Sequence, residues 1–491
     1  MINVYVESPN DKVYNRIRYV MTQILIPIGF PFRIVMGIKE DSASFSILCV
    51  PAEKLDAYRN DDRFNLVIPY NDFALWTTRD LELKMDKIEG IPVLYIGQMP
   101  QFLIHERQVG FDLINLVFFL LTRQEEYIYQ HRDQWDRFSS TYSILYDLGV
   151  LQVPIINHYI NYIESYIRRF IREVPQPRWK GNAPYAVVLS HDVDHLPSKD
   201  ITIILNRMVQ FSQCSNVSQK VKRIIRYLID ILTFKRESEP RWKLSYWTEK
   251  EREYGFRSTF FLSANISQRH ENDTTYWLSS KVDYNGKKAR LSQIAKELEE
   301  DGWEIGLHGS MNSYRDSNLL LKELDLLINN THCKVTGIRQ HYLRFDIRNT
   351  WHIHEALHLQ YDTTLGYDNR IGFRGGIALP FVPYDLDNER EYKLLEIPMC
   401  IMDSSLFFVT GEKLDIEKSL KRCQNIVDNI KQTSGLLVIN FHPHFYAAPY
   451  PDWWKVYDSI LERLSNDCAW VANASKIAGW WTEKCKLVSE E

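Results

Sequence analysis

The first third of the chain alternates between short apolar runs and longer amphipathic stretches. Residues 2–6 predict a strand, and apolar positions spaced every three or four residues over 10–28 predict a helix. The same patterns predict further strands at 32–36, 45–50, 67–69, 81–85 and 93–96, and long helices at 112–131 and 154–174. Together these elements predict a small α+β domain.

A Val-Pro-Gln-Pro-Arg stretch at residues 174–178 separates this region from the rest of the chain. Two prolines so close together end a helix and favour an extended linker. A chain of 491 residues is also longer than one hydrophobic core usually organises. We therefore predict an N-terminal α+β domain over residues 1–175 and a second domain over residues 176–491.

Strands and helices alternate regularly in the second region. Apolar runs predict strands at 187–189, 258–262, 304–307, 335–339, 395–397, 436–441 and 469–471, and helical spacing predicts helices at 242–254, 291–301 and 319–329. Such alternation predicts an α/β fold of parallel units, with functional groups at the carboxyl ends of the strands. A segment rich in Lys and Arg at about 197–240 predicts a helical insertion with a solvated charged face.

Ionisable residues follow the first strand of the second region directly. The apolar run at 187–189 is followed by Ser-His-Asp-Val-Asp-His at 190–195. Asp192 and Asp194 are two positions apart on an extended chain and so point the same way, whereas His191 points to the opposite face. Two neighbouring carboxylates do not both stay ionised easily without a cation beside them. The pair therefore predicts a metal ligand and a general base.

Three later strands also end in polar residues. The strand at 304–307 runs into His308 with Asn312 four positions on, and the other two strand ends carry Arg339 with His341 and His442 with His444. Aspartate oxygen and histidine nitrogen, with one further ligand, suit Zn²⁺ with open positions for water and substrate. Without thiolates, Co²⁺, Mn²⁺ or Ni²⁺ also fits. A metal-activated water, a carboxylate base and a histidine acid predict hydrolysis of an amide or ester.

The composition narrows the choice of partners and compartment. The net charge of −4 gives no reason to expect nucleic acid as a partner. The most apolar window, residues 114–121, is much shorter than the ~20 residues of a membrane helix, so we expect no membrane insertion. With no apparent signal peptide and no paired cysteine motif among seven cysteines, a cytoplasmic protein is expected. The polar residues Arg123, Glu125 and Glu126 could form a polar cluster, but they are interpreted as a solvated helix face.

The motifs of the second region resemble those of the polysaccharide deacetylase family, carbohydrate esterase family 4. The resemblance covers about 184–480. Residues 190–194 resemble the family's T-F-D-D-G motif, in the D-V-D form of one branch. The remaining matches are Ser-Thr-Phe-Phe-Leu at 258–262, His-Gly-Ser-Met-Asn at 308–312 for H-[ST]-x-x-H, Gly-Ile-Arg-Gln-His-Tyr at 337–342 for R-x-P, the loop at 361–374, Leu-Glu-Ile-Pro at 395–398 and Val-Ile-Asn-Phe-His at 438–442.

This resemblance implies a distorted (β/α) barrel, preceded here by the smaller α+β domain. It implies that Asp192 is the general base, that Arg339 orients it and that His442 is the general acid. It also implies a divalent metal, most readily Zn²⁺. The implied metal ligands are Asp194, His308 and Asn312, and the residues assigned to substrate binding are His341, Tyr342, Arg374 and His444.

Two departures from the family pattern affect the metal site. Asn312 stands where a second histidine is expected, and His341 stands where proline is expected. An amide oxygen is a weaker ligand for Zn²⁺ than imidazole, so His341 and His444 are alternatives to Asn312 as the remaining ligand. Residues 1–175 resemble a domain that precedes such deacetylases in bacteria, and the resemblance assigns it no activity.

The resulting hypothesis is a metal-dependent hydrolase that removes acetyl groups from N- or O-acetylated saccharides. In reaction class it is a hydrolase of carbon–nitrogen bonds other than peptide bonds. One alternative is another amide hydrolase of the same fold, and a substrate panel distinguishes the two. The other alternative is a catalytically impaired glycan-binding protein, whose affinity for glycan would be indifferent to chelator and to Asp194→Ala.

Overall fold

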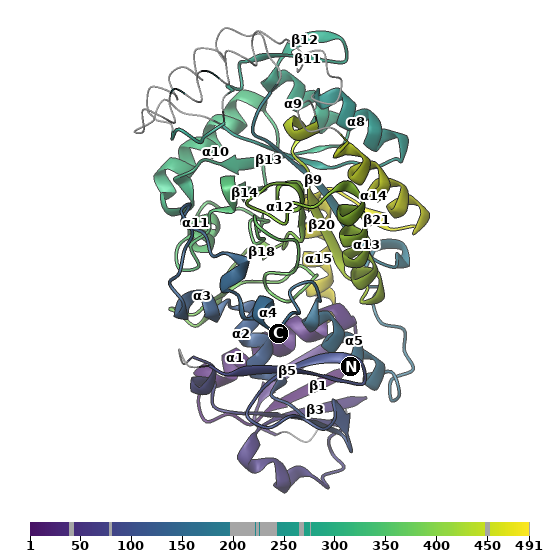
Figure 1. Cartoon of the computed structure of the whole chain (residues 1–491). Coiled ribbons are helices and arrows are strands. Elements are labelled where there is room, and N and C mark those ends of the chain that lie inside the picture. Colours follow the sequence, from purple (N-terminus) through teal and green to yellow (C-terminus); the bar gives the residue numbers. More distant parts are fainter. Residues whose placement is uncertain are drawn as a thin grey trace.

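A computed structural model describes most of the chain in two tightly associated parts (Figure 1). The described residues are 1–38, 44–77, 81–196, 221, 225, 243–264, 270–274, 276–446 and 452–490. The helical insertion that we expected at about 197–240 lies almost entirely outside them. None of the helices within these ranges is both long and apolar enough to cross a membrane.

The first part is built on a six-stranded, mostly parallel sheet. Its strand order is β2-β1-β3-β4-β8-β7. The strands are β1 (Ile2–Val6), β2 (Phe32–Met36), β3 (Phe45–Pro51), β4 (Leu66–Tyr70), β7 (Ile104–His105) and β8 (Gln108–Val109), and β5 (Leu83–Ile88) pairs with β6 (Ile91–Ile96) in a separate hairpin. The helices α1 (Asp11–Ile28), α2 (Leu113–Leu121) and α5 (Ile155–Ile167) lie between this sheet and the second part (Figure 1).

The helix that we predicted over 112–131 is broken in the structure. Helix α2 ends at Leu121, Arg123 has a left-handed backbone with a φ of 54°, and a short helix, α3 (Gln124–Ile128), follows. Our interpretation of Arg123, Glu125 and Glu126 as a solvated face was wrong, because all three residues are at most 2% exposed. Arg374 of the second part donates to Glu126, whereas Glu125 accepts from Ser143 and Ile144 of the first part.

The second part is a distorted (β/α) barrel, which confirms the predicted fold class. Its main sheet has the strand order β18-β15-β14-β13-β10-β9-β20-β19, with β21 also paired to β9, and every pairing is parallel. The strands are β9 (Ala186–Val193), β10 (Thr259–Leu262), β13 (Glu304–Gly309), β14 (Gly337–Gln340), β15 (Tyr361–Asp362), β18 (Leu395–Glu396), β19 (Ile401–Met402), β20 (Leu436–Asn440) and β21 (Trp470–Val471).

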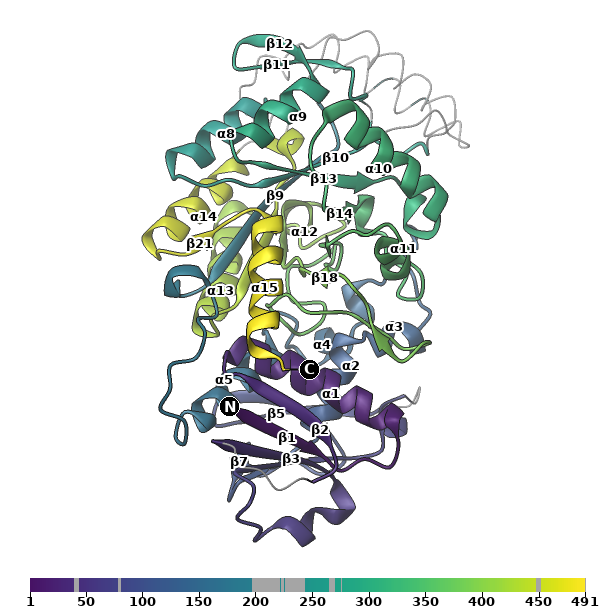
Figure 2. The same cartoon turned by 180° about the vertical axis from the view of Figure 1, so that it is seen from behind.

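Helices cover the outside of this curled sheet (Figures 1 and 2). They are α8 (Leu244–Glu253), α9 (Leu291–Glu300), α10 (Ser317–Thr331), α11 (Thr350–Ala356), α13 (Ile416–Gln432), α14 (Trp454–Asn466) and α15 (Ala474–Val488). Successive side chains of β9 alternate between two hydrophobic clusters, because the side chains of a strand point to opposite faces in turn. The sheet edges β18 and β19 are not paired with each other, so the barrel is open.

The two parts share one hydrophobic cluster. It joins residues of the first part, such as Ile17 and Leu120, to barrel residues such as Val188 and Tyr361. Helix α15 runs back along the barrel to the first part (Figure 2). Beyond it, Ser489 forms a bridge with Phe32 on the edge strand β2. The boundary at residues 175/176 remains a prediction, but the two parts are packed as one body.

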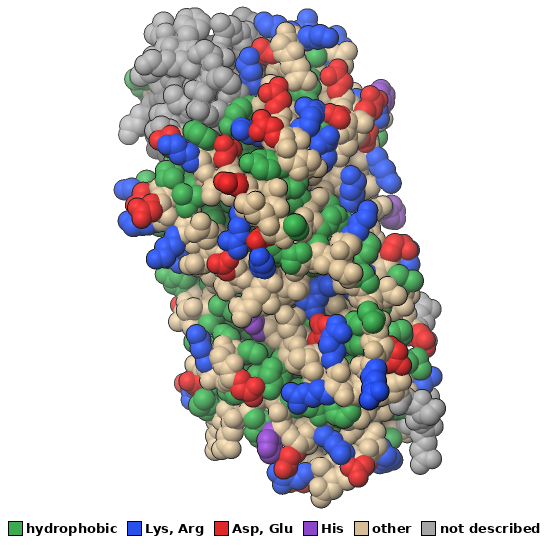
Figure 3. Space-filling model, turned by 90° about the vertical axis from the view of Figure 1, so that its right-hand side faces the viewer, with side chains coloured by type: hydrophobic (Ala, Val, Ile, Leu, Met, Phe, Trp, Pro, Cys, Tyr) green, Lys and Arg blue, Asp and Glu red, His purple; other side chains and the backbone are tan. Residues whose placement is uncertain are grey.

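The face drawn in Figure 3 carries basic and acidic side chains that are interspersed over the described surface. Charges of one sign are not gathered into one large area on that face.

Candidate metal and hydrolytic site

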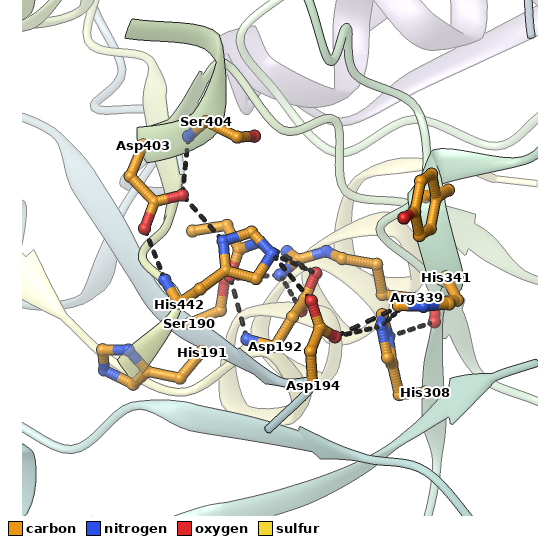
Figure 4. Close-up of polar contacts among 12 residues, drawn as sticks. Ser190, His191, Asp192, Asp194, His308, Arg339, His341, Asp403, Ser404 and His442 are labelled. Carbon is orange, nitrogen blue, oxygen red and sulfur yellow. Dashed lines mark hydrogen bonds and ion pairs between the residues drawn. The ribbon is translucent and has the colours of Figure 1, made fainter. Parts of the chain in front are cut away.

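Strand β9 brings Asp192 and Asp194 to the carboxyl end of the barrel sheet. Figure 4 shows the two carboxylates between His442 on one side and His308 on the other. His191 points to the opposite face, as the alternation predicts. There its Nδ1 lies 2.7 Å from the carbonyl oxygen of Phe441 and its Nε2 lies 2.7 Å from Glu251 Oε1. One strand thus separates a polar site from a packed aromatic face.

Asp192 is held from both sides of its carboxylate. Arg339 Nη1 donates to Oδ1 at 2.9 Å, and Asn440 Nδ2 donates to Oδ2 at 2.8 Å. The backbone amide of Asp192 also donates to Asn440 Oδ1 at 3.1 Å. Burial raises the pKa of Asp192, but the positive charge of Arg339 and the neighbouring histidines outweigh burial and hold this pKa below its usual value. Asp192 is therefore an ionised acceptor in a fixed orientation.

Arg339 is itself fixed by its surroundings. Its Nη1 donates a second hydrogen bond to Ser190 Oγ at 2.8 Å, and its Nε donates to the carbonyl oxygen of Thr363 at 3.2 Å. The guanidinium lies 4.5 Å from the centre of the Phe261 ring, a distance suited to a cation–π contact. These contacts keep Arg339 fully buried while it faces Asp192.

Asp194, His308 and His341 converge on one point. Asp194 Oδ1 lies 3.3 Å from His308 Nε2 and 3.4 Å from His341 Nδ1, and the two imidazole nitrogens are 2.9 Å apart. These three atoms could bind one metal ion together. Among the described residues, Asp194 Oδ1 is buried without a hydrogen-bond partner. Such an oxygen fits a position that a cation completes.

The tautomers of the two histidines also fit a metal ion. His308 Nδ1 lies 2.9 Å from the carbonyl oxygen of Arg339, and His341 Nε2 lies 2.8 Å from that of Asn272. A carbonyl only accepts, so both of these nitrogens carry the proton, and the neutral rings turn lone pairs toward each other. Two facing lone pairs beside a carboxylate need a shared proton or a metal ion. Backbone carbonyls are also common second partners of metal-binding histidines.

The pKa directions agree with a site that carries exchangeable positive charge. Burial lowers the pKa of His308, but Asp192 and Asp194 outweigh burial, so this pKa lies above its usual value. Burial lowers the pKa of His341 below its usual value. The two rings therefore differ in how readily each accepts a proton, although both face Asp194.

His442 faces both aspartates from the opposite side. Its Nδ1 lies 2.7 Å from Asp403 Oδ1, and its backbone amide donates to Asp403 Oδ2 at 2.6 Å. Its Nε2 lies 3.7 Å from Asp194 Oδ2 and 3.9 Å from Asp192 Oδ2. Burial lowers the pKa of His442, but the carboxylate of Asp403 outweighs burial and raises this pKa to about 9. A histidine oriented in this way suits proton donation to a leaving group.

Sequence reasoning missed Asp403 and Asn440. Asp403 begins α12 (Asp403–Phe407) directly after the short strand β19, and Asn440 ends β20 two residues before His442. Both therefore follow the pattern of polar groups at strand ends that identified the other residues. Strand β19 is only two residues long, which hid the position of Asp403 from any test of periodicity.

The structure does not place Asn312 beside Asp194. The side chain of Asn312 is exposed, and its Oδ1 accepts a hydrogen bond from Arg344 Nη1 at 3.2 Å. The residue gathered with Asp194 and His308 is instead His341, one of the two alternatives that the sequence left open. The ring of His444, the other alternative, lies 5.7 Å from that of His442, on the far side of the aspartates.

Of the residues expected to bind substrate, Tyr342 lies beside the cluster and Arg374 lies away from it. The ring of Tyr342 packs edge-on against His341 at 4.8 Å. Arg374 is 2% exposed, and its guanidinium donates to both carboxylate oxygens of Glu126, at 2.9 and 2.7 Å. The charge of Arg374 is thus used at the junction of the two parts.

Comparisons with known proteins cover both parts. A model of a family of unknown function, DUF7033, matches residues 4–171, within the predicted first domain. No curated protein matches the chain. A proposed polysaccharide deacetylase from Mycobacterium smegmatis resembles it in structure with a TM-score of 0.40 and 17% identity, covering 64% of this chain and 95% of that one.

A second structural neighbour is a mutant of a pseudoenzyme of carbohydrate esterase family 4 with restored enzymatic activity. Its TM-score is 0.26 at 11% identity, and the match covers 62% of this chain and 72% of that one. At these TM-scores neither similarity bears on the chemistry of this chain.

Proposed function

We propose that this protein is a metal-dependent hydrolase that removes acetyl groups from N- or O-acetylated saccharides. The observation that carries the proposal is the convergence of Asp194, His308 and His341 beside an ionised, oriented Asp192. Zn²⁺ suits this set of one oxygen and two nitrogen ligands, because such a set leaves positions open for water and substrate. Co²⁺, Mn²⁺ and Ni²⁺ are the alternatives.

When bound, the metal ion would polarise the substrate carbonyl and lower the pKa of a coordinated water. Asp192 accepts a proton from the attacking water. Asp192 Oδ1 accepts from Arg339 and Oδ2 accepts from Asn440, and each carboxylate oxygen has a second lone pair for a further proton donor. His442 Nδ1 donates to the Asp403 carboxylate, and this carboxylate raises the pKa of His442 to about 9, so that Nε2 also carries a proton. His442 delivers the Nε2 proton to the departing nitrogen or oxygen.

The saccharide part of the proposal is supported by aromatic rings on both sides of the site. Tyr342 lies against His341, and Phe445 lies 5.0 Å from the ring of His442. Apolar faces with a few oriented polar groups are typical of small-molecule sites. The C–H faces of a sugar ring pack well on such surfaces. The motifs that resemble polysaccharide deacetylases favour the same substrate class.

The test is release of acetate from acetylated saccharides by protein loaded with Zn²⁺ or Co²⁺. We expect Asp192→Asn and His442→Ala to reduce the rate by about 10²–10⁴-fold, the usual contribution of a general acid or base. Matched controls are Asp325→Asn and His352→Ala, exposed residues on helices α10 and α11. Equal rates in the two pairs of variants would overturn the mechanism.

A substrate panel separates acetyl-sugar hydrolysis from hydrolysis of another class of amide. If no substrate is turned over, glycan binding with and without chelator decides whether the site only binds. Binding that is unchanged by chelator and by Asp194→Ala would favour a glycan-binding protein.

A further inference from the structure

Residues 133–137 of the first part, here called the clamp segment, reach over the loops that follow β13 and β14. His308 lies near the end of β13, just before the first of these loops, and His341 begins the second. The segment lies in the aromatic stretch after α3, and α3 lies beside α11 of the barrel in both views (Figures 1 and 2). The sequence assigned no chemistry to this region.

Arg137 connects the clamp segment to the residue next to His341. Its Nη1 donates to the carbonyl oxygen of Tyr342 at 3.1 Å. Its Nη2 forms ion pairs with Asp133 Oδ2 at 2.8 Å and with Asp368 Oδ2 at 2.6 Å. The arginine side chain is 10% exposed. Because two carboxylates fix the guanidinium, it presents its remaining donor to Tyr342 in a single orientation.

The backbone that Arg137 holds is strained. Tyr342 and Leu343 have φ values of 60° and 53°, in the left-handed region that bulky residues rarely adopt. Such residues persist only where their surroundings over-determine the conformation, and they gather at functional sites. The ring of Trp135 adds a second contact, 5.2 Å from that of Tyr342. The orientation of His341 therefore depends on contacts with the first part.

Asp136 holds the other loop. Its Oδ2 accepts hydrogen bonds from the hydroxyl of Tyr314 at 2.5 Å and from Arg315 Nη1 at 2.6 Å. Arg344 ties this loop to the one that follows His341, since its Nη2 donates to the Tyr314 hydroxyl at 2.7 Å and its Nη1 donates to the carbonyl oxygen of Met311. Two adjacent residues of the first part thus reach the loop that follows His308 and β13, and the loop that contains His341.

We propose that the clamp segment is a positioning element that holds His308 and His341 in the geometry that binds metal. This inference rests on the proposed metal site and gives the first part a role: it supplies, within the same chain, the contacts that complete the site. The segment does not touch the reacting atoms. Its effect passes through the strained backbone at Tyr342 and through the loop that contains Tyr314.

The first test measures Co²⁺ affinity of the full chain by visible absorption and by calorimetry. We expect Arg137→Ala and Asp136→Asn to bind Co²⁺ about 10–100-fold more weakly, the range seen when an outer partner of a metal ligand is removed. The matched control is Arg169→Ala, an exposed arginine of the same part that is distant from the loops in sequence. Unchanged Co²⁺ affinity in both folded clamp variants would overturn the inference.

A second variant separates positioning from general damage. Glycine adopts a positive φ without strain, so Tyr342→Gly removes the need for Arg137 to hold that backbone. We expect the double variant Arg137→Ala/Tyr342→Gly to recover Co²⁺ affinity relative to Arg137→Ala alone. A further loss in the double variant would contradict the role assigned to the strained backbone.

Amide hydrogen exchange gives a readout that needs no metal. We expect faster exchange at residues 341–344 in Arg137→Ala and at 311–315 in Asp136→Asn, with no change in Arg169→Ala. If wild-type protein binds no metal, the proposed function fails, and exchange alone then decides whether the clamp holds the loops. If Arg137→Ala does not fold, Tyr314→Phe removes one clamp contact from the barrel side and takes its place.

Discussion

At the junction of the two parts, Arg123 and Arg374 face Glu125 and Glu126, and these four side chains are at most 2% exposed. Glu126 accepts from Arg123 Nε at 2.9 Å and from Arg374 Nη2 at 2.7 Å. Burial raises the pKa of Glu126, but the two arginines outweigh burial and lower this pKa to about 2. Two permanent positive charges thus balance two negative charges.

The candidate site buries charge in a different way. Asp192 has a permanent partner in Arg339, whereas the ion-pair partners of Asp194 in the described ranges of the chain are imidazoles, those of His308, His341 and His442. An imidazole is positive only while it holds a second proton, and that proton can be exchanged for a metal ion. The permanent charges of the arginines thus make the junction a structural cluster. The exchangeable charge of the histidines leaves the candidate site able to bind a cation.

Removing a ligand from the site should have the largest effect on metal binding. We expect Asp194→Ala to show no detectable Zn²⁺ binding by calorimetry at concentrations that saturate the wild type, since it removes the only carboxylate of the group. Glu126→Ala, which removes a buried carboxylate from the junction, should bind Zn²⁺ like the wild type. Equal losses in the two variants would mean that the clusters are not functionally distinct.

Breaking the junction should have the largest effect on stability. Glu126→Ala leaves Arg374 and Arg123 buried with one carboxylate between them, so we expect the free energy of unfolding to fall by about 3–5 kcal/mol. Denaturant unfolding of metal-free protein measures it. Asp194→Asn is the matched change in the candidate site. It should lower the free energy of unfolding by less than Glu126→Ala does, because a histidine beside the new amide can release its proton and become neutral. A larger loss of unfolding free energy in Asp194→Asn than in Glu126→Ala would contradict the view that the junction is the structural cluster.

Glu323 on α10 shows a third way to bury a carboxylate, without any permanent countercharge. Its Oε2 accepts from the amide of Ser310 at 3.1 Å, and burial raises its pKa from 4.5 to about 7. A raised pKa means that the folded state holds the proton more tightly than the unfolded state. The resulting stabilisation is complete below pH 4.5 and is lost as the pH rises through 7.

We therefore expect Glu323→Gln to gain up to about 3 kcal/mol over wild type between pH 4.5 and pH 8. Thermal or denaturant unfolding across that range measures the difference. Glu300→Gln, at an exposed position on α9, is the control, and its difference from wild type should not change with pH in this way. A gain for Glu323→Gln that is the same at every pH would show that ionisation of Glu323 is not its cause.

The smallest effect is expected at Asn312. Its amide oxygen is engaged with Arg344 and is not among the atoms gathered at the site. Asn312→Ala should change Zn²⁺ affinity by less than the ~10-fold that loss of an outer partner causes. A loss as large as that of His341→Ala would restore Asn312 as a ligand.

The fold class was predictable because a parallel barrel alternates strands with helices, and this alternation is visible as local patterns of apolar residues. The apolar runs at 258–262 and 304–307 are each followed by a stretch with helical spacing, at 291–301 and 319–329. The alternation along β9 separates Asp192 from His191 before any tertiary contact is known. The identity of the third nitrogen or oxygen at the site was not predictable. Asn312 lies at a turn with a φ of −109° and a ψ of −8°. It is not in an α-helix with His308, where residues four positions apart would share a face.

The buried charge cluster at the junction could not be predicted from the sequence for a different reason. Arg123, Glu125 and Glu126 look like a solvated helix face because their fourth partner, Arg374, lies far along the chain. The contacts of Asp136 and Arg137 could not be predicted for the same reason, because their partners follow β13 and β14, far along the chain. Local periodicity shows which face of an element is apolar, but it cannot show that a polar face will be covered by another charged one.

The bridge between Phe32 and Ser489 has a consequence for association between molecules. Strand β2 is the edge of its sheet, and an open edge presents unpaired backbone groups that can recruit a strand from another molecule. Glu490 donates its amide to the carbonyl oxygen of Phe32 at 3.0 Å and so occupies the start of that edge. Until α15 docks, a folding molecule lacks this cover. The danger of aggregation is therefore set by the lifetime of molecules whose last helix is still undocked, more than by the stability of the finished fold.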